Sequence, residues 1–553
     1  MSTVTPPAAY RVITPEEAER HFDVSEEVEY PYREFAAEQE IRLYPAGLAV
    51  DGDWEPEPDG DQVPYNVIVD GDLTVDGDLD WWDSAGGNFL LVTGDLRARN
   101  LLLSGCPNVV VRGDLDVRGG IQGSYGDDGG YLTVGGRTRA SVVVNTLYFR
   151  MYFAHPPQAL LIGDSHRTDC PVDFTDDELD DILRPELLGA DGTADLRAVT
   201  AALRAGLPLL RPEVRPAHEV ALDQLRALLP RAAEVTELDL SEAKLRALPE
   251  ELFAFTALRR LSLAGNADLT ELDARLGTLT ALEELDLAGL ELATLPAEIG
   301  DLHRLRVLDV SGNAFEALPD RIGELTRLET LRASGLTCPV PDAVGRLTAL
   351  RTLGLSGLQP GAYHDRVRFP RAVTALTGLR SLRLARIWLD ELPDELLGLA
   401  ELEELDLRGS LSADLPRLPD LARLEHLRVL RLSGHTPWAF QPEPPPELLD
   451  GIWEITTLEH LEIDRWGARS SGGEVTRPAL GPLPEHAFDR MPGLRSLDLS
   501  FNDLTALPGS LFRLPRLEAL DLTHTPLAAP VTERLRAVFP DLRPDLRPAP
   551  TGS

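Results

Sequence analysis

The sequence predicts an α/β repeat protein in which two solenoids follow one another along the chain. The triplet Gly-Asp-Leu recurs between short apolar strands in the N-terminal part, and leucines recur at a regular spacing from residue 233 onward. Aromatic residues make up only 6% of the chain, which suits stacked repeats that bury Leu and Val regularly. We expect an N-terminal parallel β-helix (β-solenoid), then a helical connector, then the second solenoid.

Residues 1–45 are expected to form an N-terminal cap region with one short helix. Thr14 is suited to cap this helix, Pro15 to begin it, and Glu17 to complete a capping box. A repeat array needs its open ends shielded. We therefore expect this helix to cover one end of the β-helix.

The β-solenoid is predicted over residues 46–155 from the Gly-Asp-Leu repeats. Gly77, Gly94, Gly113 and Gly135 recur at intervals of 17, 19 and 22 residues, the length of one coil. Glycine can turn a tight corner without strain because it has no Cβ. On these corners the segment resembles bacterial β-solenoid domains, including the bactofilin-like polymer-forming domains.

Residues 156–232 are expected to be a helical connector between the two solenoids. Thr175 is suited to cap a helix, and the segment 216–229 carries apolar residues at helical spacing. We expect this last helix to cover the first coil of the repeats that follow.

Residues 233–527 carry the strongest pattern in the chain, LxxLxLxxN followed by LPxxIxxL. Two examples are LRVLDVSGNAFEALPDRIGELTRL at 305–328 and LRSLDLSFNDLTALPGSLFRLPRL at 494–517. The pattern resembles the leucine-rich-repeat family of bacterial proteins and predicts about twelve coils. Residues 528–553 are expected to form a C-terminal cap helix and tail. The resemblance implies a horseshoe that recognises another protein.

An asparagine after the strand can satisfy backbone groups at the turn with its side-chain amide. Only Asn266, Asn313 and Asn502 occupy this position, and Ser410 and Thr525 are among the residues that replace asparagine elsewhere. We therefore expect the asparagine ladder to be interrupted, with backbone groups that need water or another partner.

The leucines of LxxLxLxx point inward, so alternate residues project from the concave sheet. Ser262 and Gly354 hold this central position in two coils. Its charged residues are candidate protein-binding residues: Asp239, Asp286, Asp309, Arg332, Arg383, Asp406, Arg431, Glu462, Asp498 and Asp521.

Three coils are longer than the rest, and such insertions emerge on one side of an array. They contain Tyr363, Trp438 and Trp466, residue types that are favoured at binding hot spots. These aromatic residues are the second group of candidate contacts. Tolerated surface insertions are the alternative.

The charge balance restricts the class of partner. With 53 basic and 91 acidic residues the net charge is −38, which disfavours nucleic acid and anionic membranes and favours a basic protein. Solubility alone is the other explanation of the acidic surface. No signal peptide or membrane-spanning stretch is recognisable, so a cytoplasmic location is expected.

Sequence motifs for chemistry are weak. Lys244 is the only lysine, and Ala243 precedes it, so the chain has no GxxxxGK[ST] phosphate loop. Gly163, Asp164 and Ser165 resemble the start of a GDS-type esterase block, but repeats follow in place of an α/β sheet. We expect no enzyme activity, cofactor or metal. The alternatives to protein recognition are β-helix filaments and an immunity-like protein that neutralises a basic toxin or effector.

Overall fold

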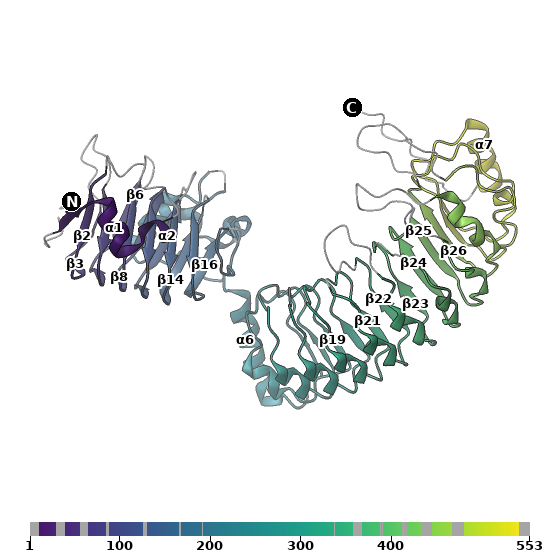
Figure 1. The fold of residues 1–553 in the computed structure, drawn as a ribbon, viewed down its shortest axis with the longest axis horizontal. Helices are drawn as coiled ribbons and strands as arrows, with labels where there is room; N and C mark the ends of the chain where they lie inside the picture. The colour runs from purple at the N-terminus through teal and green to yellow at the C-terminus, as the bar shows by residue number, and fades with distance from the viewer. Residues whose placement is uncertain are drawn as a thin grey trace. The chain divides into compact units, whose positions relative to one another are not determined.

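The protein consists of two units, residues 1–216 and 217–553, each with its own core (Figure 1). The computed structural model describes residues 10–28, 39–55, 65–83, 88–124, 130–146, 148–164, 167–190, 192–336, 338–357, 368–387, 389, 391–411, 415, 417–433, 445–466 and 480–540. Each unit is a solenoid of parallel strands, as the sequence predicts.

The first unit contains two sheets that share one interior core. The first sheet runs in the order β1 (Arg11–Ile13), β2 (Ile41–Tyr44), β4 (Asn66–Val69), β7 (Phe89–Val92), β10 (Asn108–Val111), β13 (Tyr131–Val134) and β15 (Arg150–Phe153). The second contains β3 (Leu48–Val50), β5 (Leu73–Val75), β6 (Leu79–Asp83), β8 (Leu96–Ala98), β9 (Leu101–Gly105), β11 (Leu115–Val117), β12 (Gly120–Ser124), β14 (Thr138–Asn145) and β16 (Gln158–Gly163). Apart from the antiparallel pair β1 and β2, the described strands of these two sheets pair in parallel. The rungs therefore begin at Ile41 and continue to Gly163, beyond both limits of the expected range 46–155.

One corner of this solenoid is a column of stacked Gly-Asp pairs. The backbone N–H groups of Gly94, Gly113 and Gly136 each donate to the carbonyl of the glycine one rung earlier, beginning with Gly71, at 3.0–3.1 Å. A Cβ on Gly94 would lie 2.7 Å from the backbone carbon of Gly71, so the rungs could not approach. Gly77 does not belong to this column.

The expected alignment of Gly77 and Gly135 with the other corner glycines is therefore wrong. Gly77 stacks on Gly52 at another corner, and Gly136 takes the place expected for Gly135. The error arises because coil length varies from rung to rung, so a nearly constant sequence interval does not identify the stacked residues.

The aspartates of the Gly-Asp pairs form a second ladder along the same corner. The carboxylates of Asp72, Asp95 and Asp114 accept hydrogen bonds at 2.8–2.9 Å from the backbone N–H of residues 95, 114 and 137 respectively. Each aspartate thus satisfies the backbone of the next rung, a role that the sequence analysis did not assign to it.

Helices α1 (Pro15–Phe22) and α2 (Val24–Glu27) lie on the outer face of the first sheet (Figure 1). Thr14 and Glu17 form the predicted capping box. Phe22 and Val24 pack against the outward residues Ile68 and Leu91 of the sheet. The expectation that this helix covers one end is therefore wrong, because these strands are apolar on both faces and the helices bury the outer one.

The segment after β16 also packs on the side of the solenoid. It contains η1 (Asp176–Glu178), α4 (Leu179–Ile182), η2 (Pro185–Leu187) and α5 (Leu196–Arg204). These helices cover Leu102, Val142 and Ile162 on the outer face of the second sheet. Residues 156–216 thus belong to the first unit, and the expected connector 156–232 divides between the two units.

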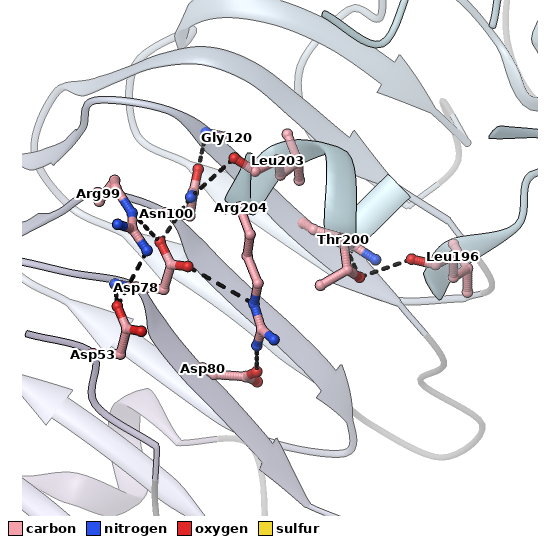
Figure 2. A network of polar contacts seen from close by, with 11 residues as sticks. Asp53, Asp78, Asp80, Arg99, Asn100, Gly120, Leu196, Thr200, Leu203 and Arg204 are labelled. Carbon is pink, nitrogen blue, oxygen red and sulfur yellow. Dashed lines mark hydrogen bonds and ion pairs between the residues drawn. The ribbon is translucent and has the colours of Figure 1, made fainter. Parts of the chain in front are cut away.

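Figure 2 shows how α5 is held against the second sheet. Arg204 pairs with Asp80 and lies 3.8 Å from Asp78, and Asn100 donates to Asp78 at 2.7 Å and to the carbonyl of Leu203 at 3.2 Å. A Cβ on Gly120 would lie 2.5 Å from a methyl group of Leu203, so a larger residue here would force that side chain to move.

The second unit is a curved parallel sheet of twelve strands, as predicted (Figure 1). Its strands are β17 (Glu237–Asp239), β18 (Arg260–Ser262), β19 (Glu284–Asp286), β20 (Val307–Asp309), β21 (Thr330–Arg332), β22 (Thr352–Gly354), β23 (Ser381–Arg383), β24 (Glu404–Arg408), β25 (Val429–Ser433), β26 (His460–Asp464), β27 (Ser496–Asp498) and β28 (Ala519–Asp521). Leucines such as Leu285 and Leu308 are fully buried between the sheet and the convex side.

Short 3-10 helices return the chain along the convex side. They are η4 (Glu250–Ala254), η5 (Ala274–Thr278), η6 (Ala297–Asp301), η7 (Asp320–Glu324), η8 (Asp342–Arg346), η9 (Arg371–Ala375), η10 (Asp394–Gly398), η11 (Leu421–Arg423), η12 (Pro446–Glu454) and η13 (Leu511–Arg513). Seven of them, η4 and η6 to η10 together with η12, follow directly after a proline, which cannot donate a backbone hydrogen bond.

The asparagine ladder has the predicted role. Asn313 accepts from the N–H of Leu292 at 3.0 Å and donates to the carbonyls of Leu287 and Val310 at 2.8 and 3.0 Å. Ser410 accepts from Ile387 at 3.0 Å and donates to a backbone carbonyl, and Thr525 also donates to one. The Ser410 hydroxyl therefore replaces the amide as donor and acceptor, and the Thr525 hydroxyl replaces it as donor, at two coils where we had expected the backbone groups to need water or another partner.

Helices close the core of the second unit at both ends. Helix α6 (Ala217–Leu228), followed by η3 (Leu229–Arg231), buries Ala221 and Leu225 against the first coil, as predicted. Helix α7 (Ala529–Val538) buries Leu535 against the same core.

Candidate functional site

The central row of the concave sheet is aligned in register across all twelve strands. Asp239 pairs in register with Ser262, Asp286 with Asp309, and the row continues to Asp498 and Asp521. Each strand projects this residue from the face opposite the buried leucines. Residues far apart in the sequence therefore lie side by side in one charged row.

The arginines of the row are paired with acidic residues. Arg332 lies 3.7 Å from Asp309, Arg383 lies 3.4 Å from Glu404, and Arg431 also pairs with Glu404. Burial alone would raise the pKa of Glu404, but hydrogen bonds from Ser381 and Arg431 lower it. The middle of the row is therefore much less positive than its arginines suggest, because Glu404, which the sequence analysis did not select, neutralises two of them.

Asp286 is part of an acidic group in the first coils. Burial raises the pKa of its carboxyl, and the neighbouring charges of Asp309 and Asp239 act in the same direction. A hydrogen bond from the backbone of Ala288 opposes them. This end of the row favours a positive partner, since a cation would relieve the repulsion between the carboxylates.

A second acidic group lies at β26 and β27. Burial raises the pKa of both Glu462 and Asp464, and the charge of Asp498 adds to both shifts. Arg408 lies 3.5 Å from Glu462, and Arg465 lies 3.2 Å from Asp464. The sequence analysis missed Asp464 because it considered only one residue per strand, although the next outward residue is two positions later.

Two candidate contact residues are not accessible. Asp406 is only 2% exposed, because Arg408 covers it in a paired contact at 2.8 and 3.0 Å. Trp466 is 1% exposed and belongs to the hydrophobic core. Both expectations are wrong. Asp406 has the sequence position of an outward residue, but the neighbouring Arg408 covers it. Trp466 belongs to an insertion by sequence, but its side chain turns into the core of the coil.

The other aromatic candidates, Tyr363 and Trp438, lie outside the described residues, as does Ser165 of the possible esterase motif. In the described ranges no three His, Cys, Asp or Glu side chains are grouped as a metal site would require. No helix of the described structure is long and apolar enough to cross a membrane.

Comparison with known families supports the assignment of the second unit. Residues 243–367 match the model of a leucine-rich repeat region, and residues 476–527 match that of a leucine rich repeat. These matches fall on the twelve-stranded ladder with its buried leucines. The second unit is a leucine-rich-repeat domain.

Curated relatives share only part of the chain. The volume-regulated anion channel subunit LRRC8A is similar over 165 residues, with 37% identity for the human protein and 36% for the rat protein. The match covers 29% of this chain and 18% of each relative. The chain thus spans less than a fifth of the length of these relatives.

Among solved structures, three similar ones cover between 40% and 61% of this chain. A Leptospira interrogans LRR protein has 24% identity and a TM-score of 0.35, covering 58% of this chain and 98% of that one. An internalin of Listeria monocytogenes has 15% identity and a TM-score of 0.38, covering 61% and 95%. The leucine-rich-repeat domain of the type III effector XopL has 25% identity and a TM-score of 0.32, covering 40% and 85%.

Proposed function

We propose that this chain is a non-enzymatic, cytoplasmic scaffold that binds a protein partner through the concave face of its leucine-rich-repeat domain. The observation that carries the proposal is the in-register charged row, which is acidic toward both ends and contains arginines in its middle. Leucine-rich-repeat domains generally mediate protein–protein interaction, and solenoids offer extended concave surfaces for this purpose.

The charge of the chain favours a basic partner. The net charge of −38 repels nucleic acid and anionic lipid, and it would accelerate the association of a positively charged protein. Association steered in this way is expected to weaken as the ionic strength rises.

The experiment is affinity capture with the full chain, comparing concave and convex charge reversals. The concave variant carries Asp286→Arg, Asp309→Arg and Asp498→Arg. The control carries Glu298→Arg and Asp320→Arg in η6 and η7 on the convex side. A partner captured by the wild type should be lost from the concave variant and kept by the control. Equal capture by all three proteins would contradict binding at the concave face.

Filament formation through the β-solenoid is a weaker hypothesis. Strand β1 pairs antiparallel with β2 and occupies the edge of the first sheet, so the parallel ladder of that sheet does not continue to its edge. Neutralisation of a basic toxin or effector is a special case of the proposed binding, and the same capture experiment would identify such a partner.

A further inference from the structure

One column of residues at the end of the concave strands has left-handed backbone geometry. Glycine occupies this position, three residues after the central row, in six described coils, with φ between 66° and 77° at Gly265, Gly289, Gly312, Gly335, Gly357 and Gly409. A residue with a Cβ is disfavoured in this conformation by about 1–2 kcal/mol. Glycine is therefore the residue that the repeat itself favours.

Glu242 and Arg386 replace glycine in single coils, with φ of 53° and 58°, whereas the last three coils all depart from glycine. Arg465, Phe501 and His524 occupy the same position, with φ of 50°, 56° and 58°. The Arg465 guanidinium lies 4.6 Å from the centre of the Phe501 ring, and the Phe501 and His524 ring centres are also 4.6 Å apart. We call these three side chains the C-terminal stack. Phe501 is nevertheless 41% exposed, so the stack presents part of an apolar ring to solvent.

Two carboxylates lie on the same coils as Phe501 and His524. Asp498 and Asp521 are partners in the parallel register, and each lies three residues before a ring of the stack. Asp498 accepts from the N–H of Ser500 at 2.8 Å, and Asp521 accepts from the N–H of Thr523 at 2.8 Å. Among the described residues no arginine pairs with either carboxylate. The central part of the row differs, because its arginines are paired with Asp309 and Glu404.

We propose that the last coils bind a lysine or arginine side chain of a protein partner, with its charge at Asp498 and Asp521 and its apolar stem on Phe501. The proposal rests on the proposed function and specifies where on the concave face the partner is held. Long basic side chains bury their methylene stems on apolar surface while the charge meets a carboxylate. Because the Arg465 guanidinium already lies 4.6 Å from the centre of the Phe501 ring, the proposal places the partner's charge at the two carboxylates and only its stem on the ring.

The probe is a random dodecapeptide library displayed on phage and selected on the full chain. We expect the selected peptides to be enriched in Arg and Lys. Synthetic copies of them should bind at least tenfold more weakly to Asp498→Asn/Asp521→Asn and to Phe501→Gly in fluorescence polarisation. The matched control, Glu298→Gln/Asp320→Asn in η6 and η7 on the convex side, should bind normally. Asp286→Asn/Asp309→Asn, the first-coil variant on the concave face, should weaken binding less than Asp498→Asn/Asp521→Asn.

Phe501→Gly also distinguishes binding from folding. Glycine relieves the left-handed strain, so the thermal midpoint should stay unchanged or rise while binding falls. A lowered midpoint in Phe501→Gly, with normal binding by Asp498→Asn/Asp521→Asn, would assign the ring to the fold and overturn the proposal.

The remaining outcomes separate this proposal from the proposed function. If only the first-coil variant loses binding, the concave face binds a partner but the last coils do not hold the cation. If neither Asp286→Asn/Asp309→Asn nor Asp498→Asn/Asp521→Asn loses binding, both proposals fail. The proposal of a lysine or arginine side chain is overturned if the selected peptides are not enriched in Arg and Lys. It is also overturned if the chain selects no more peptides than the bare matrix does.

Discussion

The guanidinium of Arg306 meets the carboxylate of Glu329 across two neighbouring coils, with both nitrogen–oxygen distances at 2.9 Å. The pair belongs to a ladder formed by the residues that directly precede the strands, where most neighbouring coils carry opposite charges. Other contacts of this ladder join Arg259 to Glu283 and Arg380 to Glu403. The ladder links coils at the surface, where solvent screens each pair.

A double-mutant cycle should measure this contact. We expect Arg306→Ala and Glu329→Ala to show a coupling energy of about 0.5 kcal/mol in the free energy of unfolding, because the pair is exposed. The coupling should diminish in 1 M salt. Arg304→Ala with Glu329→Ala is the matched control, since Arg304 is exposed and no ion pair is described for it. A coupling in the control as large as in the pair would contradict the prediction.

Removing the amide of Asn313 should destabilise the second unit strongly. Asn313→Ala leaves the N–H of Leu292 and two carbonyls without their partner in the buried core, at a cost of about 2–3 kcal/mol. Thermal unfolding followed by circular dichroism would measure the change. Thr326→Ala at an exposed position is the control and should change the midpoint little. A decrease of less than about 0.5 kcal/mol in the free energy of unfolding would show that water replaces the amide.

Asp80 should make the stability of the first unit depend on pH. Burial raises its pKa to about 6, since the attraction of Arg204 is too weak to offset desolvation and the repulsion from Glu55 and Asp78. The folded state therefore binds more protons than the unfolded state between about pH 4 and 6. Stability should fall as pH rises through this window, and the full penalty is present above about pH 6.

Asp80→Asn should remove much of this dependence and raise the free energy of unfolding by about 1–2 kcal/mol at neutral pH. Asp176, whose pKa burial also raises to about 6, keeps part of the slope. Chemical denaturation at pH 4.5 and 7.5 would measure both effects. Asp181→Asn, at an exposed position, is the control. If Asp80→Asn destabilises the unit at pH 7.5, the pair with Arg204 outweighs desolvation and the prediction is wrong.

The leucine-rich-repeat domain should fold as a fragment, and α6 should stabilise it. We expect residues 212–553 to unfold cooperatively, because Ala221 and Leu225 cover the first coil. Residues 233–553 expose that coil and should have a clearly lower thermal midpoint. The ion pair between Arg226 and Glu251, at 2.9 Å, is lost with the helix. Equal midpoints for the two fragments would show that α6 is dispensable.

The sequence by itself determined the repeat architecture and the central row of the concave sheet. The leucine spacing is a local pattern, and each coil packs on its immediate neighbours, so the same short motif predicts the same strand in every coil. The amide role of Asn313 and the cap at Thr14 followed for the same reason, since each depends on a few adjacent residues.

Only the tertiary structure decided which side chains meet. Glu404 neutralises Arg383 and Arg431, and Arg408 buries Asp406, through contacts that depend on strand register and side-chain direction. The C-terminal stack joins Arg465 and Phe501 from coils of unequal length. Sequence intervals cannot identify such partners, because insertions change the distance along the chain while the parallel hydrogen bonds keep the strands in register.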